Sequence, residues 1–174
     1  IALVSFFVFS AIVFVAVFAP LVSPTNPYDL STVDIMDSRL PPGATNFSGQ
    51  TFWLGTDGAG RDMVSAIFYG LRVSLGVGAM SGVIALTIGS FVGISAAFFR
   101  GRYETFVMRF VDIQLSFPSI LVALIIIAAF GKGIEKTMIA LILVQWAYYA
   151  RTARASALVE MNKEYVDAAR CLAF

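Results

Sequence analysis

Histidine is absent from this 174-residue chain, and cysteine occurs once, at Cys171. Zinc sites built from histidine and cysteine, and catalytic pairs of these two residues, need side chains that the sequence does not contain. A single cysteine also excludes a disulfide within the chain. We therefore expect no zinc site of this kind, no cysteine–histidine catalytic pair and no internal disulfide.

Charged residues are scarce as well, at 13% of the sequence against about 25% in soluble domains. Four stretches lack Asp, Glu, Lys and Arg entirely, namely residues 1–19, 73–99, 113–131 and 137–150. This pattern excludes a soluble enzyme and a disordered tail. The net charge of +1 gives no sign of a nucleic-acid-binding surface.

The length of these stretches predicts membrane-spanning helices. About 20 apolar residues cross the roughly 30 Å of hydrocarbon in a bilayer, because a helix rises 1.5 Å per residue. Three stretches meet this length, and the shorter fourth is flanked by Lys136 and Arg151, whose long side chains can reach the interface. We predict an all-α, polytopic fold with four crossings. A secretory signal for the first stretch and a re-entrant segment for the fourth are the alternatives.

The positions of arginine and lysine predict the orientation. Basic residues concentrate in the connection after the second stretch and in the tail after the fourth: Arg100, Arg102, Arg109, Arg151, Arg154, Lys163 and Arg170. The positive-inside rule then places these segments, and both termini, in the cytoplasm.

Small residues and one proline mark the apolar stretches. In the second stretch small residues recur every fourth position, as Ser74, Gly78 and Gly82, and as Ala85, Gly89, Gly93 and Ala97. Such stripes let helices in lipid approach closely, so we predict packing against another helix of the chain. Pro118 in the third stretch predicts a kink or a late helix start.

The connection between the first two stretches is rich in turn-forming residues over residues 20–52 and is predicted to be irregular. Thr56 or Asp57 is then expected to cap an amphipathic helix that lies at the interface before the chain turns into the membrane. Glycines at 55, 58 and 60 do not form a nucleotide-binding loop, because no Lys-Ser/Thr follows them. The charged residues Asp57, Arg61 and Asp62 have two interpretations, a local cluster or a contact with an external partner.

The tail is strongly helix-favouring, so the fourth helix is predicted to continue past Ala150. A second, short helix is predicted after residues 161–163. Its apolar face consists of Tyr165, Ala168, Ala169 and Leu172. Such a small, flat face admits the groove of another protein, and a solvated helix end is the alternative.

Three segments together resemble the permease subunit of a bacterial ATP-binding-cassette importer, in the branch that serves dipeptides, oligopeptides and nickel. The branch signature before its first core helix is matched by residues 70–75 and by Leu54, Gly55, Thr56, Asp57, Gly60, Arg61 and Asp62. A stretch at the start of the next helix is matched by Asp112, Ser116, Phe117 and Pro118. Residues 164–170 resemble the opening of the EAA loop, which forms the ATPase-coupling helix in the family.

The resemblance implies a type I importer permease-like fold in the bacterial inner membrane, without enzymatic activity of its own. ATP hydrolysis would occur in two separate ATPase subunits, and a homologous second permease and a periplasmic solute-binding protein would complete the importer. The implied ATPase contacts are Glu164, Tyr165, Asp167, Ala168, Ala169 and Arg170, with Asp167 where the motif has Glu.

The apolar stretches and the resemblance together predict a domain plan. Residues 1–19 form a first transmembrane helix, 20–60 an external periplasmic loop, 61–150 a permease core of an amphipathic lead-in and three transmembrane helices, and 151–174 a cytoplasmic tail. Ala173 stands where the family has Gly, and about two further helices are expected after it. The chain is therefore interpreted as the N-terminal portion of a permease, either a fragment or a truncated reading frame.

Three other functions compete with peptide import. A nickel importer of the same branch would show the same motifs, and a truncated, non-transporting membrane interaction protein would lack an ATPase partner. An ion channel or proton-coupled transporter needs ionisable residues inside the membrane, and the four stretches contain none.

Overall fold

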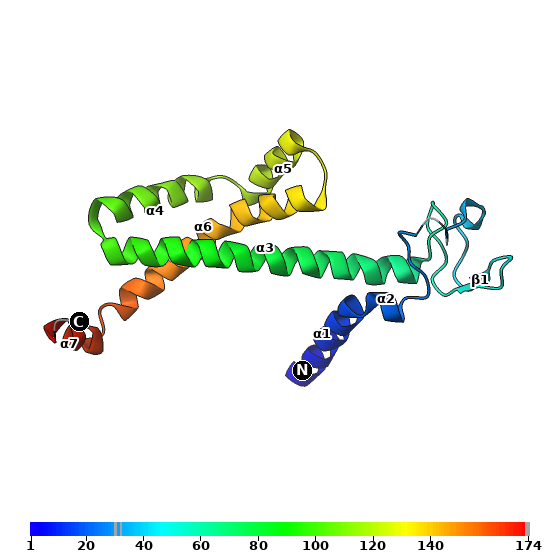
Figure 1. The fold of residues 1–174 in the computed structure, drawn as a ribbon, viewed down its shortest axis with the longest axis horizontal. Coiled ribbons are helices and arrows are strands. Elements are labelled where there is room, and N and C mark those ends of the chain that lie inside the picture. The colour runs from blue at the N-terminus through cyan, green and yellow to red at the C-terminus, as the bar shows by residue number, and fades with distance from the viewer. Residues whose placement is uncertain (30, 32, 173–174) are drawn as a thin grey trace. The chain divides into compact units, whose positions relative to one another are not determined.

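The computed structural model describes residues 1–29, 31 and 33–172, with Arg170 described in its backbone only. The regular structure is helical apart from two very short strands in the loop between α2 and α3, so the all-α prediction is confirmed (Figure 1). It divides into two compact units, Ile1–Gly76 and Val77–Phe174. The elements are α1 (Ala2–Val17), α2 (Ala19–Val22), a 3-10 helix (Ile35–Asp37), β1 (Ala44–Thr45), β2 (Thr51–Phe52), α3 (Met63–Phe99), α4 (Gly101–Ser116), α5 (Ser119–Phe130), α6 (Ile134–Glu160) and α7 (Glu164–Cys171).

In the first unit, the irregular loop packs on the first turns of α3. The amide and hydroxyl groups of Thr25 both donate hydrogen bonds to Ser65 Oγ, at 3.1 and 3.0 Å. The rings of Tyr28 and Tyr69 meet edge to face, with centroids 5.8 Å apart. Ser65 is a polar residue of the amphipathic segment, yet it is fully buried because the loop covers it.

Helix α3 runs without interruption over 37 residues. The expectation that the chain turns between an interfacial lead-in helix and the membrane helix is wrong, because one continuous helix runs from Met63 to Phe99. At 1.5 Å per residue the helix is about 55 Å long, well beyond the roughly 30 Å of a hydrocarbon core. The lead-in and the second apolar stretch form one element.

In the second unit, the C-terminal part of α3 and helix α4 pack on α6. Their shared core contains Val111, Ala147 and Ala150, with Val92, Met108, Leu115 and Trp146 around it. A Cβ atom at Gly89 would lie 2.4 Å from the Trp146 carbonyl oxygen, and one at Gly93 would lie 2.2 Å from that of Ala150. The predicted close packing is confirmed for this stripe, whereas Gly78 and Gly82 face open space.

The third apolar stretch is broken at Phe117 and Pro118. Both residues have extended ψ angles, 138° and 123°, and α4 and α5 meet there at a bend of 86°. Proline lacks the amide hydrogen and disfavours a helical conformation for the residue before it. The predicted late helix start after Pro118 is confirmed. The prediction of a single membrane-spanning helix over residues 113–131 is wrong, because α5 has only 12 residues and is about 18 Å long.

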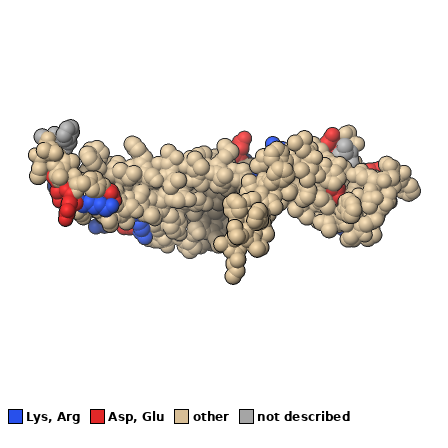
Figure 2. Space-filling view, turned by 90° about the horizontal axis from the view of Figure 1, so that it is seen from below, with Lys and Arg blue, Asp and Glu red and all other residues tan. Residues whose placement is uncertain are grey.

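The tail follows its prediction. Helix α6 continues past Ala150 to Glu160, and α7 begins at Glu164 after a short turn. Charged side chains gather at this end of the second unit in Figure 2.

Within the described residues, α3 is the one helix that is long and apolar enough to cross a membrane by itself. The bent pair α4 and α5 would make a second crossing if it acts as a single span. Helix α1 is apolar but has 16 residues. Four crossings therefore remain a prediction.

Candidate functional site

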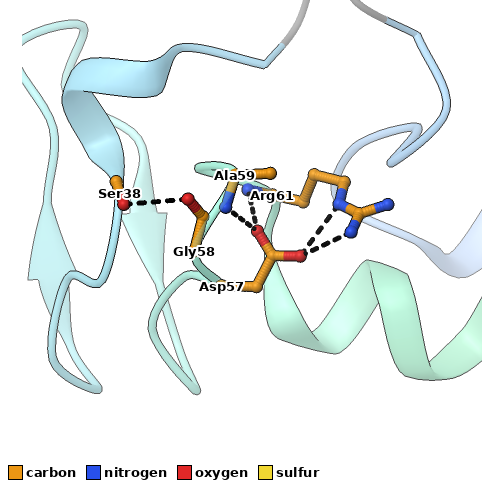
Figure 3. Close-up of polar contacts among 5 residues, drawn as sticks. All are labelled: Ser38, Asp57, Gly58, Ala59 and Arg61. Atoms are coloured by element: carbon orange, nitrogen blue, oxygen red, sulfur yellow. Dashed lines mark hydrogen bonds and ion pairs between the residues drawn. The ribbon is translucent and has the colours of Figure 1, made fainter.

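The signature over residues 54–62 folds back on the segment around the 3-10 helix. Arg39 donates its amide hydrogen to the Asp57 carbonyl at 3.0 Å. Ser38 donates its hydroxyl hydrogen to the Gly58 carbonyl at 3.1 Å (Figure 3). The Thr56 amide donates to the Leu40 carbonyl at 3.2 Å. The signature thus gives this loop a defined backbone path, although strands β1 and β2 have only two residues each.

Thr56 is the buried centre of this arrangement. Its hydroxyl accepts a hydrogen bond from the Leu40 amide at 2.8 Å and donates one to the Asp37 carbonyl. Asp37 in turn accepts a hydrogen bond from the Asn46 side chain at 3.0 Å. A hydroxyl suits this position because it donates and accepts at once.

Asp57 closes the turn that follows. One carboxylate oxygen accepts the amides of Ala59 and Arg61 at 2.8 and 2.9 Å, and the other pairs with the Arg61 guanidinium at 2.8 Å (Figure 3). Burial raises the pKa of Asp57, but these hydrogen bonds and the arginine charge outweigh it, and the pKa lies below its ordinary value. The contacts support the local-cluster interpretation. A contact with an external partner stays a prediction.

Two signature glycines are required by the backbone. Gly55 and Gly60 have φ angles of +77° and +81°, in the left-handed region that glycine adopts most readily. A Cβ atom would lie 2.3 Å from the Leu40 carbonyl oxygen at Gly55 and 2.0 Å from that of Asp34 at Gly60. Leu54, by contrast, is exposed.

Asp62 caps α3. Its carboxylate accepts hydrogen bonds from the Ser65 amide, at 2.9 Å, and from the Ser65 hydroxyl. The predicted cap at Thr56 or Asp57 is wrong, because the helix begins only at Met63 and both side chains are engaged within the loop. The signal that could have identified the cap is an Asp three residues before a Ser, directly ahead of the helical pattern.

The second matched stretch lies at the end of a helix. Asp112 and Ser116 belong to the last turns of α4, and Phe117 and Pro118 form the break, whereas the resemblance placed them at the start of the next helix. Asp112 pairs with Arg151 of α6. The Ser116 hydroxyl donates to the Asp112 carbonyl at 2.7 Å.

Three further polar contacts between α4 and α6 were not predicted. The side-chain amide of Gln114 donates to the Leu143 carbonyl, and the Trp146 indole donates to Gln114 Oε1 at 3.1 Å. Glu104 pairs with Arg154. The partners lie 29 to 50 residues apart, so no local spacing in the sequence could indicate them.

The predicted coupling residues lie on α7. Glu164, Tyr165, Asp167 and Ala168 are exposed and Ala169 is half-buried, while the side chain of Arg170 and all of Ala173 lie outside the described residues. The Tyr165 hydroxyl donates to Glu160, which also pairs with Lys163 at 2.7 Å. The hydrogen bond to Glu160 raises the pKa of Tyr165 above its ordinary value.

Comparison with known proteins relates both ends of the chain to transport proteins. Residues 85–174 match the family described as binding-protein-dependent transport system inner membrane component, and residues 1–42 match the N-terminal TM domain of oligopeptide transport permease C.

Similar curated proteins include the di/tripeptide transport system permease protein DppC of Pseudomonas aeruginosa, 41% identical over 91% of this chain and 52% of the relative. The dipeptide transport system permease protein DppC of Escherichia coli K12 is 39% identical with the same coverage. The oligopeptide transport system permease protein OppC of Bacillus subtilis is 32% identical over 98% of this chain and 53% of the relative. The chain spans about half the length of these relatives. On the family match over residues 85–174, the chain belongs to the family of binding-protein-dependent transport system inner membrane components.

Proposed function

We propose that this chain acts as the membrane-spanning permease subunit of an ATP-driven importer and forms part of a pathway for peptides across the bacterial inner membrane. The observation that carries the proposal is the pair of family matches in chain order, at residues 1–42 and 85–174. The relatives' names, which refer to dipeptide, di/tripeptide and oligopeptide transport, support peptides as the solute.

In this proposal α7 is the contact with an ATPase subunit. Its exposed face combines the Tyr165 ring with the methyl group of Ala168, so a partner's groove could close on the backbone. Closure of the ATPase subunits on ATP can reorient the membrane helices only if the interaction free energy between α7 and the ATPase differs between the two states of the importer. Two ATPase subunits, a second permease and a periplasmic binding protein would be the partners, with both termini of this chain in the cytoplasm.

Co-purification of the matched ATPase with the complete permease tests the assignment. Ala168→Trp should reduce ATPase recovery about tenfold or more, because the indole would overlap the partner's groove. Ala155→Trp is the matched control, since Ala155 is also an exposed alanine but lies on α6. Glu164→Ala should have little effect, because an exposed charge contributes about 0 to 1 kcal/mol. Equal recovery for wild type and Ala168→Trp would refute the role of α7.

The solute is tested by uptake into liposomes that contain the complete importer. Accumulation of a labelled dipeptide that depends on ATP and on the binding protein is expected. Uptake of nickel in place of peptide would overturn the solute assignment while leaving the ATPase contact intact.

A further inference from the structure

Helix α6 is joined to α4 by an ion pair near the α3–α4 turn. Arg154 of α6 donates from Nε, at 2.7 Å, and from Nη2 to the same carboxylate oxygen of Glu104. The two side chains are 31% and 19% exposed. A guanidinium bound through two nitrogens is restricted in orientation as well as in distance.

The backbone of α3 reaches α6 at the same level. A Cβ atom at Gly93 would lie 2.2 Å from the Ala150 carbonyl oxygen and 2.9 Å from the Arg154 amide nitrogen. The absence of a side chain at Gly93 therefore lets α3 touch α6 where Arg154 leaves the helix. Three helices meet at this point.

A second contact lies six residues further along α6, about 9 Å away at 1.5 Å per residue. Each carboxylate oxygen of Glu160 has a partner, Tyr165 Oη for one and Lys163 Nζ, at 2.7 Å, for the other. The hydrogen bonds from Lys163 and Tyr165 lower the pKa of Glu160, so the carboxylate is favoured in its charged form. The first turn of α7 is thereby tied to the last turn of α6.

We propose that Arg154 and Glu160 are positioning residues that join α7 to α4, so that a displacement of α7 moves the α3–α4 end of the second unit with it. The inference rests on the proposed function, because it assumes that an ATPase subunit displaces α7. Coupling between distant sites is carried by contiguous contacts of this kind, and both residues lie on one uninterrupted helix.

A distance measurement tests the rigid connection without an ATPase. Spin labels at Thr105→Cys on α4 and Glu164→Cys on α7, with Cys171→Ser, should give a narrow distance distribution in the complete permease. Arg154→Gln or Glu160→Gln should broaden it. Arg151→Gln removes the same charge one turn earlier, from a pair formed through a single guanidinium nitrogen, and should leave the width unchanged. Equal widths in all four proteins would overturn the proposal.

The amount of peptide transported per ATP hydrolysed tests, in the assembled importer, whether a displacement of α7 reaches the α3–α4 end of the second unit. Arg154→Gln should leave ATPase recovery and basal hydrolysis intact but lower peptide transport per ATP by about fivefold or more, a normal size for allosteric coupling. The charge exchange Glu104→Arg with Arg154→Glu should restore it. A merely structural pair would not change this ratio, so an unchanged ratio in Arg154→Gln contradicts the proposal. Failure of the wild-type permease to bind an ATPase would instead refute the proposed function, while the distance measurement would still decide the connection.

Discussion

Individual residues in the loop before α3 suit its backbone geometry or form several hydrogen bonds each. Gly55 and Gly60 permit left-handed turns against carbonyl oxygens, Thr56 donates and accepts at one atom, and Asp57 accepts from the amide groups that follow it. Each of these roles is met by contacts within the loop. The contacts therefore give a structural reason for these four residues of the family signature.

Gly60→Ala should destabilise this loop. A left-handed conformation costs a residue with a side chain about 1 to 2 kcal/mol, and the new methyl group would also meet the Asp34 carbonyl oxygen. Faster amide hydrogen exchange over residues 34–62 is the expected result. Gly58→Ala is the matched control, since nothing lies within 4 Å of a Cβ atom there. Similar exchange rates in the two variants would show that the close approach to Asp34 is not formed.

Helices in the second unit pack through the smallest side chains. The stripe Ala85, Gly89, Gly93 and Ala97 was recognisable because small residues recur at helical spacing, and in the structure Gly89 and Gly93 meet the backbone of α6. The sequence could not show that, among the described residues, the stripe with Gly78 and Gly82 has no such neighbour, because both stripes have the same spacing. Contact is decided by which helix lies opposite.

Gly89→Leu should disrupt the contact between α3 and α6. The added side chain has no space beside the Trp146 carbonyl oxygen and Tyr149 Cβ, and overpacking of this kind costs about 1 to 3 kcal/mol. A lower thermal unfolding temperature in detergent would be measured. Gly82→Leu serves as the control, because a Cβ atom there meets nothing within 4 Å. Unchanged stability of Gly89→Leu would contradict the packing.

Across the whole chain, basic residues concentrate near the α3–α4 turn and after residue 150, while residues 20–60 carry more Asp than Arg. This distribution is the basis for the expected orientation, with the loop outside and the tail inside the cell. The helices themselves are compatible with either direction of insertion.

Cysteine labelling in intact cells measures this orientation. Ser48→Cys in the loop should react with a membrane-impermeant thiol reagent, and Ser156→Cys on α6 should react only after the cells are opened, with Cys171→Ser as the background. Both side chains are exposed, so neither is protected by folding. Labelling of position 156 but not of position 48 in intact cells would reverse the topology.

Much of the architecture could be predicted because it depends on local composition. Apolar runs, Pro118 and the alanine-rich tail predicted the helical class, the break before α5 and the start of α7, and the quoted motifs predicted the family. The exact cap of α3 could not be predicted, since Thr56, Asp57 and Asp62 are all suitable capping residues. Only the folded loop shows that the first two are already engaged.

The sequence by itself determined that the chain is helical, apolar and a transport-system inner membrane component, because hydropathy, helix-breaking residues and motifs are local properties of the polypeptide. Tertiary structure alone decided the burial of Ser65, the pairing of Glu104 with Arg154 and the contact of Trp146 with Gln114. These contacts join residues 32 to 50 positions apart, which meet only when the loop packs on α3 and when α4 packs on α6. Periodicity along one helix indicates which face is apolar, but the partner of each polar side chain is set by the register between helices.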